Sequence, residues 1–283
     1  MESKNLFSQI FLALDTKTAE EKCNLTQEIY KNFENLNLDK DTEILELRIP
    51  TYANFCQIVE PKRVPQGKYL KSDLNAAHLL HSLAHIEFSA IDLALDCAYR
   101  FRNLPKNYYF DWISVANEEV GHFMQLKNIL ESLGFKYGDF FVHSVLFDSL
   151  KKCNVLLDRI ALVPRGMEAV GLDVNPFLCA KVQNSKHKIK NELLQVLKII
   201  LNDEISHVKK GDIWFKYFCD TFKIPANLRE KTYIEILKKY NFSFPKANAK
   251  LNINARLEAG FSLKELELLE LESKNAFISR NPK

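Results

Sequence analysis

The feature that most constrains this chain is a four-residue step that occurs twice, as Glu119-Val120-Gly121-His122 and as Glu204-Ile205-Ser206-His207. Within each step the Glu and the His are three residues apart, which puts both side chains on one face of a helix. The flanking apolar residues recur with helical periodicity and place both steps on inward-facing stripes. A buried carboxylate is costly without a partner of opposite charge, so the pattern favours a bound cation.

Two further carboxylates, Glu87 and Glu168, lie on the apolar stripes of two other helical segments. Periodicity also selects Glu119 over its neighbour Glu118, which aligns with the polar side of its helix. Four helices that supply Glu, Glu-x-x-His, Glu and Glu-x-x-His provide the ligands of di-iron and di-manganese carboxylate sites. We therefore predict a dinuclear metal centre held by six residues, namely Glu87, Glu119, His122, Glu168, Glu204 and His207.

Oxygen and imidazole donors without thiolates suit two Fe ions, with Mn as the alternative, and zinc is expected only as an adventitious occupant. Carboxylates next to the ligands are candidates to orient the histidines: Asp203 for His122, and Glu118 for His207. The alternative is that both acids are solvated. The residues identify no catalytic group beyond the ligands themselves.

A histidine stripe, His78, His81 and His85, lies roughly opposite Glu87 on the same predicted helix. We interpret it as a polar or interface face, with a second metal site or a proton relay as the alternatives. None of these interpretations adds a ligand to the predicted dinuclear centre.

The composition favours long helices, because 283 residues contain only 8 Gly and 9 Pro and are 47% hydrophobic. The net charge of +3 does not by itself indicate a nucleic-acid partner. Six scattered cysteines without a Cys-x-x-Cys pair predict reduced thiols and a cytoplasmic location. No apolar run reaches the length of a membrane span.

The predicted organisation is all-α with three parts: N-terminal helices and an extended connector over 1–70, a helical core over 71–223, and a helical C-terminal extension over 224–283. Pro164 is expected to kink or restart its helix, and Pro176 to begin another short helix. The expected helices cover 6–36 (one or two helices), 73–102, 110–133, 148–172, 189–222, 228–240, 255–260 and 262–271.

Several motifs resemble an uncharacterised bacterial family of the ferritin-like superfamily, and the resemblance spans about residues 8 to 270. They are His81–Glu87, Asp111–Phe123, Tyr137–Asp139, Leu162–Arg165, Glu168–Val174, Asp203–Val208 and Asn254–Phe261. The resemblance implies a ferritin-like four-helix bundle with additional N- and C-terminal helices, carrying the six ligands named above. The chain departs from the expected motif at Val170, where we expect the family to have Arg.

The segment Glu168-Ala169-Val170-Gly171 also resembles the third-helix motif of the tRNA-modifying hydroxylase of that superfamily, a di-iron monooxygenase. We therefore expect an oxidoreductase that activates O₂ and acts on a small-molecule substrate. One alternative is a tRNA-modifying enzyme, with Lys62, Arg63, Lys68 and Lys71 as its basic surface. The others are an iron-binding ferroxidase or storage protein, and a non-catalytic scaffold stabilised by metal. The extra terminal helices would obstruct a storage shell, so we expect a monomer or small homo-oligomer.

Overall fold

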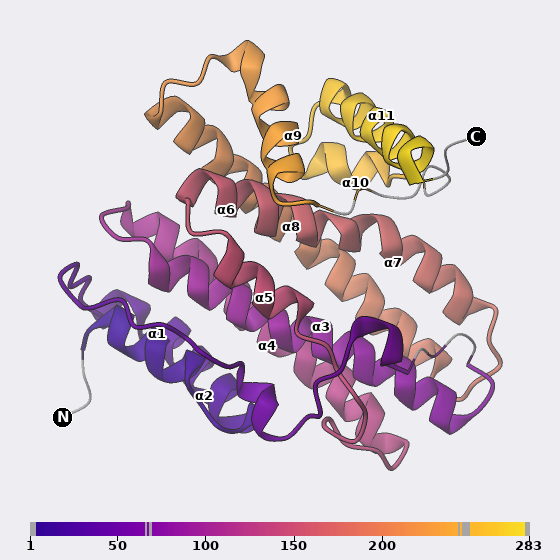
Figure 1. Ribbon diagram of the computed structural model, residues 1–283. Helices are drawn as coiled ribbons and strands as arrows, with labels where there is room; N and C mark the ends of the chain where they lie inside the picture. The colour runs from indigo at the N-terminus through magenta and orange to yellow at the C-terminus, as the bar shows by residue number, and fades with distance from the viewer. Residues whose placement is uncertain (1–3, 66, 68–69, 243, 245–249, 281–283) are drawn as a thin grey trace. The chain divides into compact units, whose positions relative to one another are not determined.

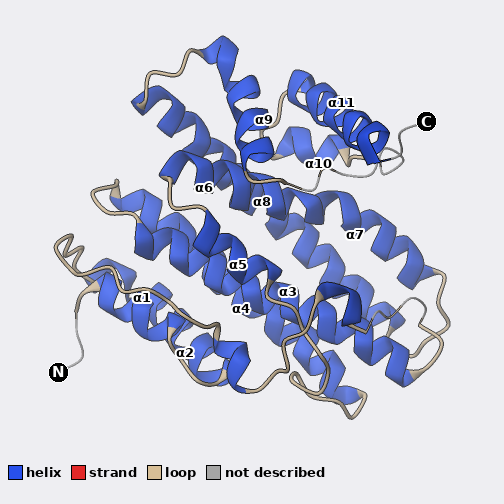
Figure 2. Cartoon of the chain, in the orientation of Figure 1, coloured by secondary structure: helices blue, strands red, loops and turns tan. Residues whose placement is uncertain are grey.

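The computed structural model is built from helices, as Figure 2 shows, and the predicted all-α class is confirmed. It describes residues 4–65, 67, 70–242, 244 and 250–280. Over these ranges there is no strand, only two isolated parallel bridges, Asn5 with Asn37 and Ile58 with Val142. None of the described helices is long and apolar enough to cross a membrane. All six cysteines are free, as predicted.

The chain divides into two compact units, one of residues 1–151 with 182–196 and the other of residues 152–181 with 197–283. The three-part division at 70/71 and 223/224 is a different partition, based on sequence alone, and it stays a prediction. The helices α7 and α8 each contribute residues to both units, because the chain passes from one unit to the other within them.

The first unit is organised around the long helices α3 and α4, which run side by side in Figure 1 and against which α1 and α2 pack. Ser72 caps α3 by accepting the N–H of Asn75, and Thr18 and Glu21 form a capping box at the start of α2. The helices of this unit are α1 (Leu6–Leu14), α2 (Ala19–Asn32), α3 (Asp73–Arg100), α4 (Lys106–Ser132) and α5 (Val145–Lys152).

The predicted connector contains two short 3₁₀ turns, Thr51–Asn54 and Pro61–Arg63, and a further turn, Phe33–Asn35, follows α2. Tyr52 is fully buried, so the connector is anchored to its unit. Its backbone also pairs with a later loop, since Val59 donates its N–H to the carbonyl of Val142 at 2.8 Å.

The second unit holds the remaining helices, in which α9 packs against both α6 and α11. Its elements are α6 (Leu156–Leu162), the π turn η4 (Val163–Met167), α7 (Glu168–Gln183), α8 (Lys190–Thr221), the 3₁₀ turn η5 (Ala226–Leu228), α9 (Arg229–Lys239), α10 (Ile253–Glu258) and α11 (Leu263–Arg280).

The predictions for Pro164 and Pro176 have opposite outcomes, and the predicted helix around Pro164 needs correction. The single helix predicted over 148–172 is wrong, because this range contains the end of α5, all of α6, the π turn and the first residues of α7. The predicted restart at Pro164 is confirmed, because α6 ends at Leu162, the π turn contains the proline, and the α-helix begins again at Glu168 as α7. Pro176 begins no helix, since it lies inside α7.

Candidate metal centre

Three of the predicted ligands meet in the first unit. Glu87 comes from α3, and Glu119 and His122 come from successive turns of α4. Their exposed fractions are 5%, 0% and 1%. The Nδ1 atom of His122 lies 3.2 Å from a carboxylate oxygen of each glutamate. One donor atom from each of the three residues lies within 4.8 Å of the other two.

The helical register explains why these polar side chains point inward. On α3, Glu87 follows the buried Ala84 by three residues and precedes the buried Ile91 by four. On α4, Ala116 and Phe123 hold the equivalent positions around Glu119, and both are buried. The apolar contacts of α3 with α4 therefore bring the three polar groups together inside the first unit.

The electrostatics of this cluster favour a positive charge. Burial, and then the neighbouring Glu119, raise the pKa of Glu87. Burial alone would lower the pKa of His122, but the carboxylates of Glu119 and Glu87 outweigh that effect and raise it. Two buried carboxylates thus draw a cation towards Nδ1 of His122, and in the metal-free protein a proton can serve as that cation.

The donor set fits a divalent metal ion of the iron or manganese type. It offers carboxylate oxygens and an imidazole nitrogen, and it contains no thiolate. His122 would bind through Nδ1, because that ring nitrogen faces both carboxylates. The cluster contributes three protein ligands, so a metal ion there would need further donors.

The other three predicted ligands belong to the second unit. Glu168 is the first residue of α7 and is half-buried, while on α8 Glu204 is half-buried and His207 is fully buried. Donor atoms of Glu204 and His207 lie within 4.8 Å of each other. The Glu-x-x-His spacing therefore brings the two donors together in this unit as it does in the first.

The face of α7 that carries Glu168 is directed towards α8. Gly171, three residues after Glu168, lies so close to α8 that a Cβ there would be 3.9 Å from the carboxyl carbon of Glu204. Further along the same face, the side-chain amide of Asn175 donates to the carbonyl of Leu197 at 2.8 Å. Glu168 of α7 and Glu204 of α8 thus lie on helix faces that are directed towards each other within the second unit.

Glu118 and Asp203, the two acids predicted to orient the histidines, are half-buried. Glu118 accepts a hydrogen bond from the hydroxyl of Ser114 at 3.2 Å. Its predicted role towards His207, and that of Asp203 towards His122, stay predictions.

Of the two interpretations of the histidine stripe, a polar or an interface face, the structure supports the interface, because His81 and His85 are buried and His78 is half-buried. These rings pack against the chain's own loop of residues 137–143. The ring of His85 binds the hydroxyl of Tyr137 at 2.9 Å through Nδ1 and the carbonyl of His143 at 2.8 Å through Nε2. The stripe therefore fastens a loop to α3.

Two arginines have structural roles that the sequence analysis did not assign, although both stand in the motifs quoted there. Arg256 is buried and binds the carboxylate of Asp173 through Nε at 2.9 Å and Nη2 at 2.6 Å. Arg165 is fully buried and binds Asp212 and Glu265. A charged residue beside apolar helix positions is the only signal of such a pair in the sequence, and it does not identify the partner.

The comparisons with known proteins agree on the family. The model of the family described as "Protein of unknown function (DUF455)" matches residues 15–267. A protein from Haemophilus influenzae, described as an uncharacterized protein, is 35% identical over 274 residues, which is 92% of each chain. No solved structure gives a significant match. This chain therefore belongs to the DUF455 family of proteins of unknown function.

Proposed function

We propose that this protein binds two divalent metal ions, iron or manganese, and uses them as an oxidoreductase that activates O₂ for a small-molecule substrate. The observation behind the proposal is the cluster of Glu87, Glu119 and His122, in which two carboxylates and an imidazole converge out of contact with solvent. Buried carboxylates are unfavourable without a compensating cation, and a proton on His122 is the alternative to a metal ion.

The remaining ligands are assigned from the sequence pattern. Glu168, Glu204 and His207 repeat the order Glu then Glu-x-x-His, which in ferritin-like carboxylate proteins completes a dinuclear site. Glu87 and Glu168 would each hold metal without a His partner one turn further along the same helix, unlike Glu119 and Glu204. A ferritin-like bundle is part of this proposal.

The chain's own residues have two tasks in this mechanism. Glu119 and His122 hold donor atoms at fixed positions on one rigid helix, since they lie on successive turns of α4. The apolar neighbours Ala84, Ile91 and Phe123 exclude water from these donors. Bound iron or manganese would supply the redox chemistry with O₂, which no side chain of the cluster provides.

Metal analysis of anaerobically purified protein tests the proposal. We expect about two Fe or Mn ions per chain in the wild type, the number that a dinuclear carboxylate site holds, and a large loss in Glu119→Gln, which keeps the shape of the side chain but removes its charge. Glu131→Gln is the matched control, because Glu131 is an exposed residue of the same helix that pairs with Lys127. Wild-type protein that stays metal-free after reconstitution with Fe(II) would refute metal binding.

An O₂-consumption assay then separates the enzyme from a scaffold. A loaded wild type that consumes O₂ with an added reductant, beside an inactive Glu119→Gln, supports the oxidoreductase. If bound metal raises the stability of the protein but the loaded protein consumes no O₂, the result supports a non-catalytic scaffold.

The tRNA-modifying alternative stays a prediction. Lys62 is already paired with Glu60 at 2.7 Å, and Lys68 lies outside the described residues. That alternative rests on the motif resemblance.

The cytoplasmic location and the small homo-oligomer also stay predictions.

A further inference from the structure

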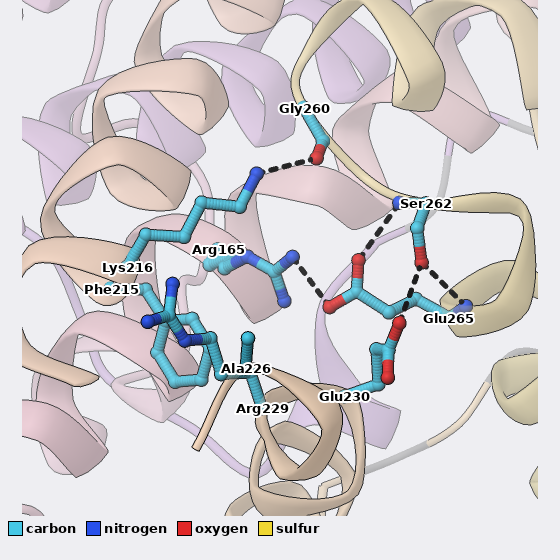
Figure 3. Close-up of a pocket in the computed structure, with 9 residues that line it drawn as sticks. All are labelled: Arg165, Phe215, Lys216, Ala226, Arg229, Glu230, Gly260, Ser262 and Glu265. Carbon is cyan, nitrogen blue, oxygen red and sulfur yellow. Dashed lines mark hydrogen bonds and ion pairs between the residues drawn. The ribbon is translucent and has the colours of Figure 1, made fainter. Parts of the chain in front are cut away.

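The second unit contains a cavity of about 220 Å³ that is separate from the predicted ligands. It lies where the π turn η4 meets the beginnings of α9 and α11 (Figure 3). Ala226 and Lys216 on its border are exposed, so the cavity reaches the protein surface. Its lining consists of Arg165, Phe215, Lys216, Ala226, Arg229, Glu230, Gly260, Ser262 and Glu265.

Arg165 is the most deeply buried charge of this lining, with no exposed surface. Its Nε and Nη2 atoms bind Asp212 at 3.0 and 2.9 Å, and Nη2 also binds Glu265 at 2.7 Å. Burial opposes its charge, but Glu265 first, then Tyr233 and Asp212, raise the pKa of Arg165, so the guanidinium stays charged. Its third nitrogen, Nη1, has no hydrogen-bond partner within the described part of the chain.

Arg229 offers a second buried donor to the same cavity. Its Nη2 atom pairs with Asp220, while its Nε atom is buried and has no hydrogen-bond partner among the described residues. A guanidinium nitrogen is a donor and never an acceptor, so both unused groups need an acceptor from outside the lining.

The acidic residues of the lining do not meet this need, since each is already paired. Glu230 accepts from Lys264 at 2.8 Å. Glu265 accepts from Arg165 and from the backbone N–H of Ser262, as Figure 3 shows. The third lining cation, Lys216, is held by Asp212 at 2.6 Å and by the carbonyl of Gly260 at 3.1 Å.

The shape of the wall is also specific. Gly260 has a φ of +103°, a conformation that L side chains rarely adopt, and a Cβ there would collide with the carboxylate of Asp212. A side chain at this position would displace the carboxylate that holds Arg165. The absence of a side chain at Gly260 thus lets Asp212 hold the guanidinium of Arg165 in the lining of the cavity.

We propose that this cavity binds a small organic anion through a carboxylate or phosphate group that accepts hydrogen bonds from Arg165 and Arg229. Guanidinium donors form their strongest hydrogen bonds with such oxyanions, in charge-assisted geometry. The volume lies below the range of roughly 300–1,000 Å³ of drug-sized sites, so the ligand has few atoms beyond its anionic group. The site uses none of the predicted metal ligands, so it does not depend on the proposed function.

Isothermal titration calorimetry of the full chain tests the proposal, with inorganic phosphate and acetate as probes and chloride at matched ionic strength as the blank. We expect saturable binding of at least one probe, weakened at least tenfold in Arg229→Gln. Lys231→Gln should bind as the wild type does, because Lys231 is an exposed residue of α9 outside the lining. Binding of phosphate without acetate identifies a phosphate ester as the ligand class, and the reverse identifies a carboxylate.

A second variant protects the test against a folding defect in Arg229→Gln. Ala226→Glu adds a carboxylate at an exposed position of the lining and should abolish probe binding while thermal stability stays unchanged. Binding should also persist in Glu119→Gln, which separates this site from the metal centre. No saturable binding above the chloride blank, or equal binding in wild type, Arg229→Gln and Ala226→Glu, would mean that the cavity holds water only.

Discussion

The hydrogen bonds of His81 and His85 require both imidazole rings to be neutral. The carbonyl of His143 can only accept, so Nε2 of His85 carries the proton and Nδ1 accepts from the hydroxyl of Tyr137. The Nε2 atom of His81 accepts the N–H of Gly138 at 3.0 Å, so that nitrogen is unprotonated. Burial lowers the pKa of both rings to about 4.

Because both rings are buried in the neutral form, we expect the protein to lose stability in mild acid. The unfolded chain takes up a proton at each histidine near pH 6.5, whereas the folded chain does so only near pH 4. The stabilisation is therefore complete above pH 6.5 and falls between pH 6.5 and 4. Between pH 7.5 and 5.5 we expect a loss of roughly 1 kcal/mol in the free energy of unfolding for each ring.

Urea unfolding at pH 7.5 and 5.5, wild type beside His81→Gln, measures this effect. Gln still offers an oxygen to the N–H of Gly138 but does not titrate, so the variant should lose about 1 kcal/mol less than the wild type on acidification. Comparing the two proteins cancels the other titrating groups. An identical loss in both would show that His81 is already accessible to protons in the folded state.

At the scale of elements, α7 shows what local sequence cannot predict. Pro176 has no N–H for the carbonyl of Leu172, four residues earlier, so a break was the reasonable prediction. The side-chain amide of Asn252 donates to that carbonyl instead, at 3.1 Å. The compensating group lies 80 residues further along the chain, beyond the reach of any local pattern.

Other elements were predictable because their signals are local. The ends of α3, α4, α8 and α9 fall within four residues of the predicted positions. Ser72 and Pro105 directly precede α3 and α4, and Pro225 directly precedes the short turn η5 between α8 and α9. Helical periodicity also correctly separated the buried Glu119 from the half-buried Glu118. Periodicity left the histidine stripe open between a polar and an interface face, because its partners come from the loop of residues 137–143, which has no helical period.

Two helical glycines provide the prediction at this scale. Gly211 of α8 faces the π turn, and a Cβ there would meet Pro164 Cβ at 3.1 Å and the backbone nitrogen of Arg165 at 3.2 Å. Gly121 of α4 has nothing within 4 Å of the corresponding position. We therefore expect Gly211→Ala to destabilise the protein by about 1–3 kcal/mol through overpacking.

Gly121→Ala is the matched control, and it should stabilise the protein by roughly 0.5–1 kcal/mol, because alanine favours a helix and restricts the unfolded chain. Urea unfolding of both variants at pH 7.5 gives the two values. Changes of the same sign would contradict the close approach of α8 to the π turn.

At the scale of the whole molecule, the two sets of predicted ligands pose one question, which is whether they serve the same metal site. Glu87, Glu119 and His122 belong to one compact unit, and Glu168, Glu204 and His207 belong to the other. A metal ion that binds only the folded protein stabilises it by RT ln(1 + [M]/Kd), about 2.7 kcal/mol at a free concentration one hundred times Kd. Every residue that contributes to binding should contribute to this stabilisation.

Thermal unfolding with Mn(II) answers the question, because manganese uses the same donors as iron and is stable in air at neutral pH. We expect the melting temperature of the wild type to rise by several degrees, at roughly 2–4 °C for each kcal/mol in a domain of 150–250 residues. His122→Gln and His207→Gln should both lose this rise, whereas Glu131→Gln should keep it. If His207→Gln kept the full rise, the metal would bind to the first unit alone, and the six-residue dinuclear site would be refuted while metal binding itself would stand.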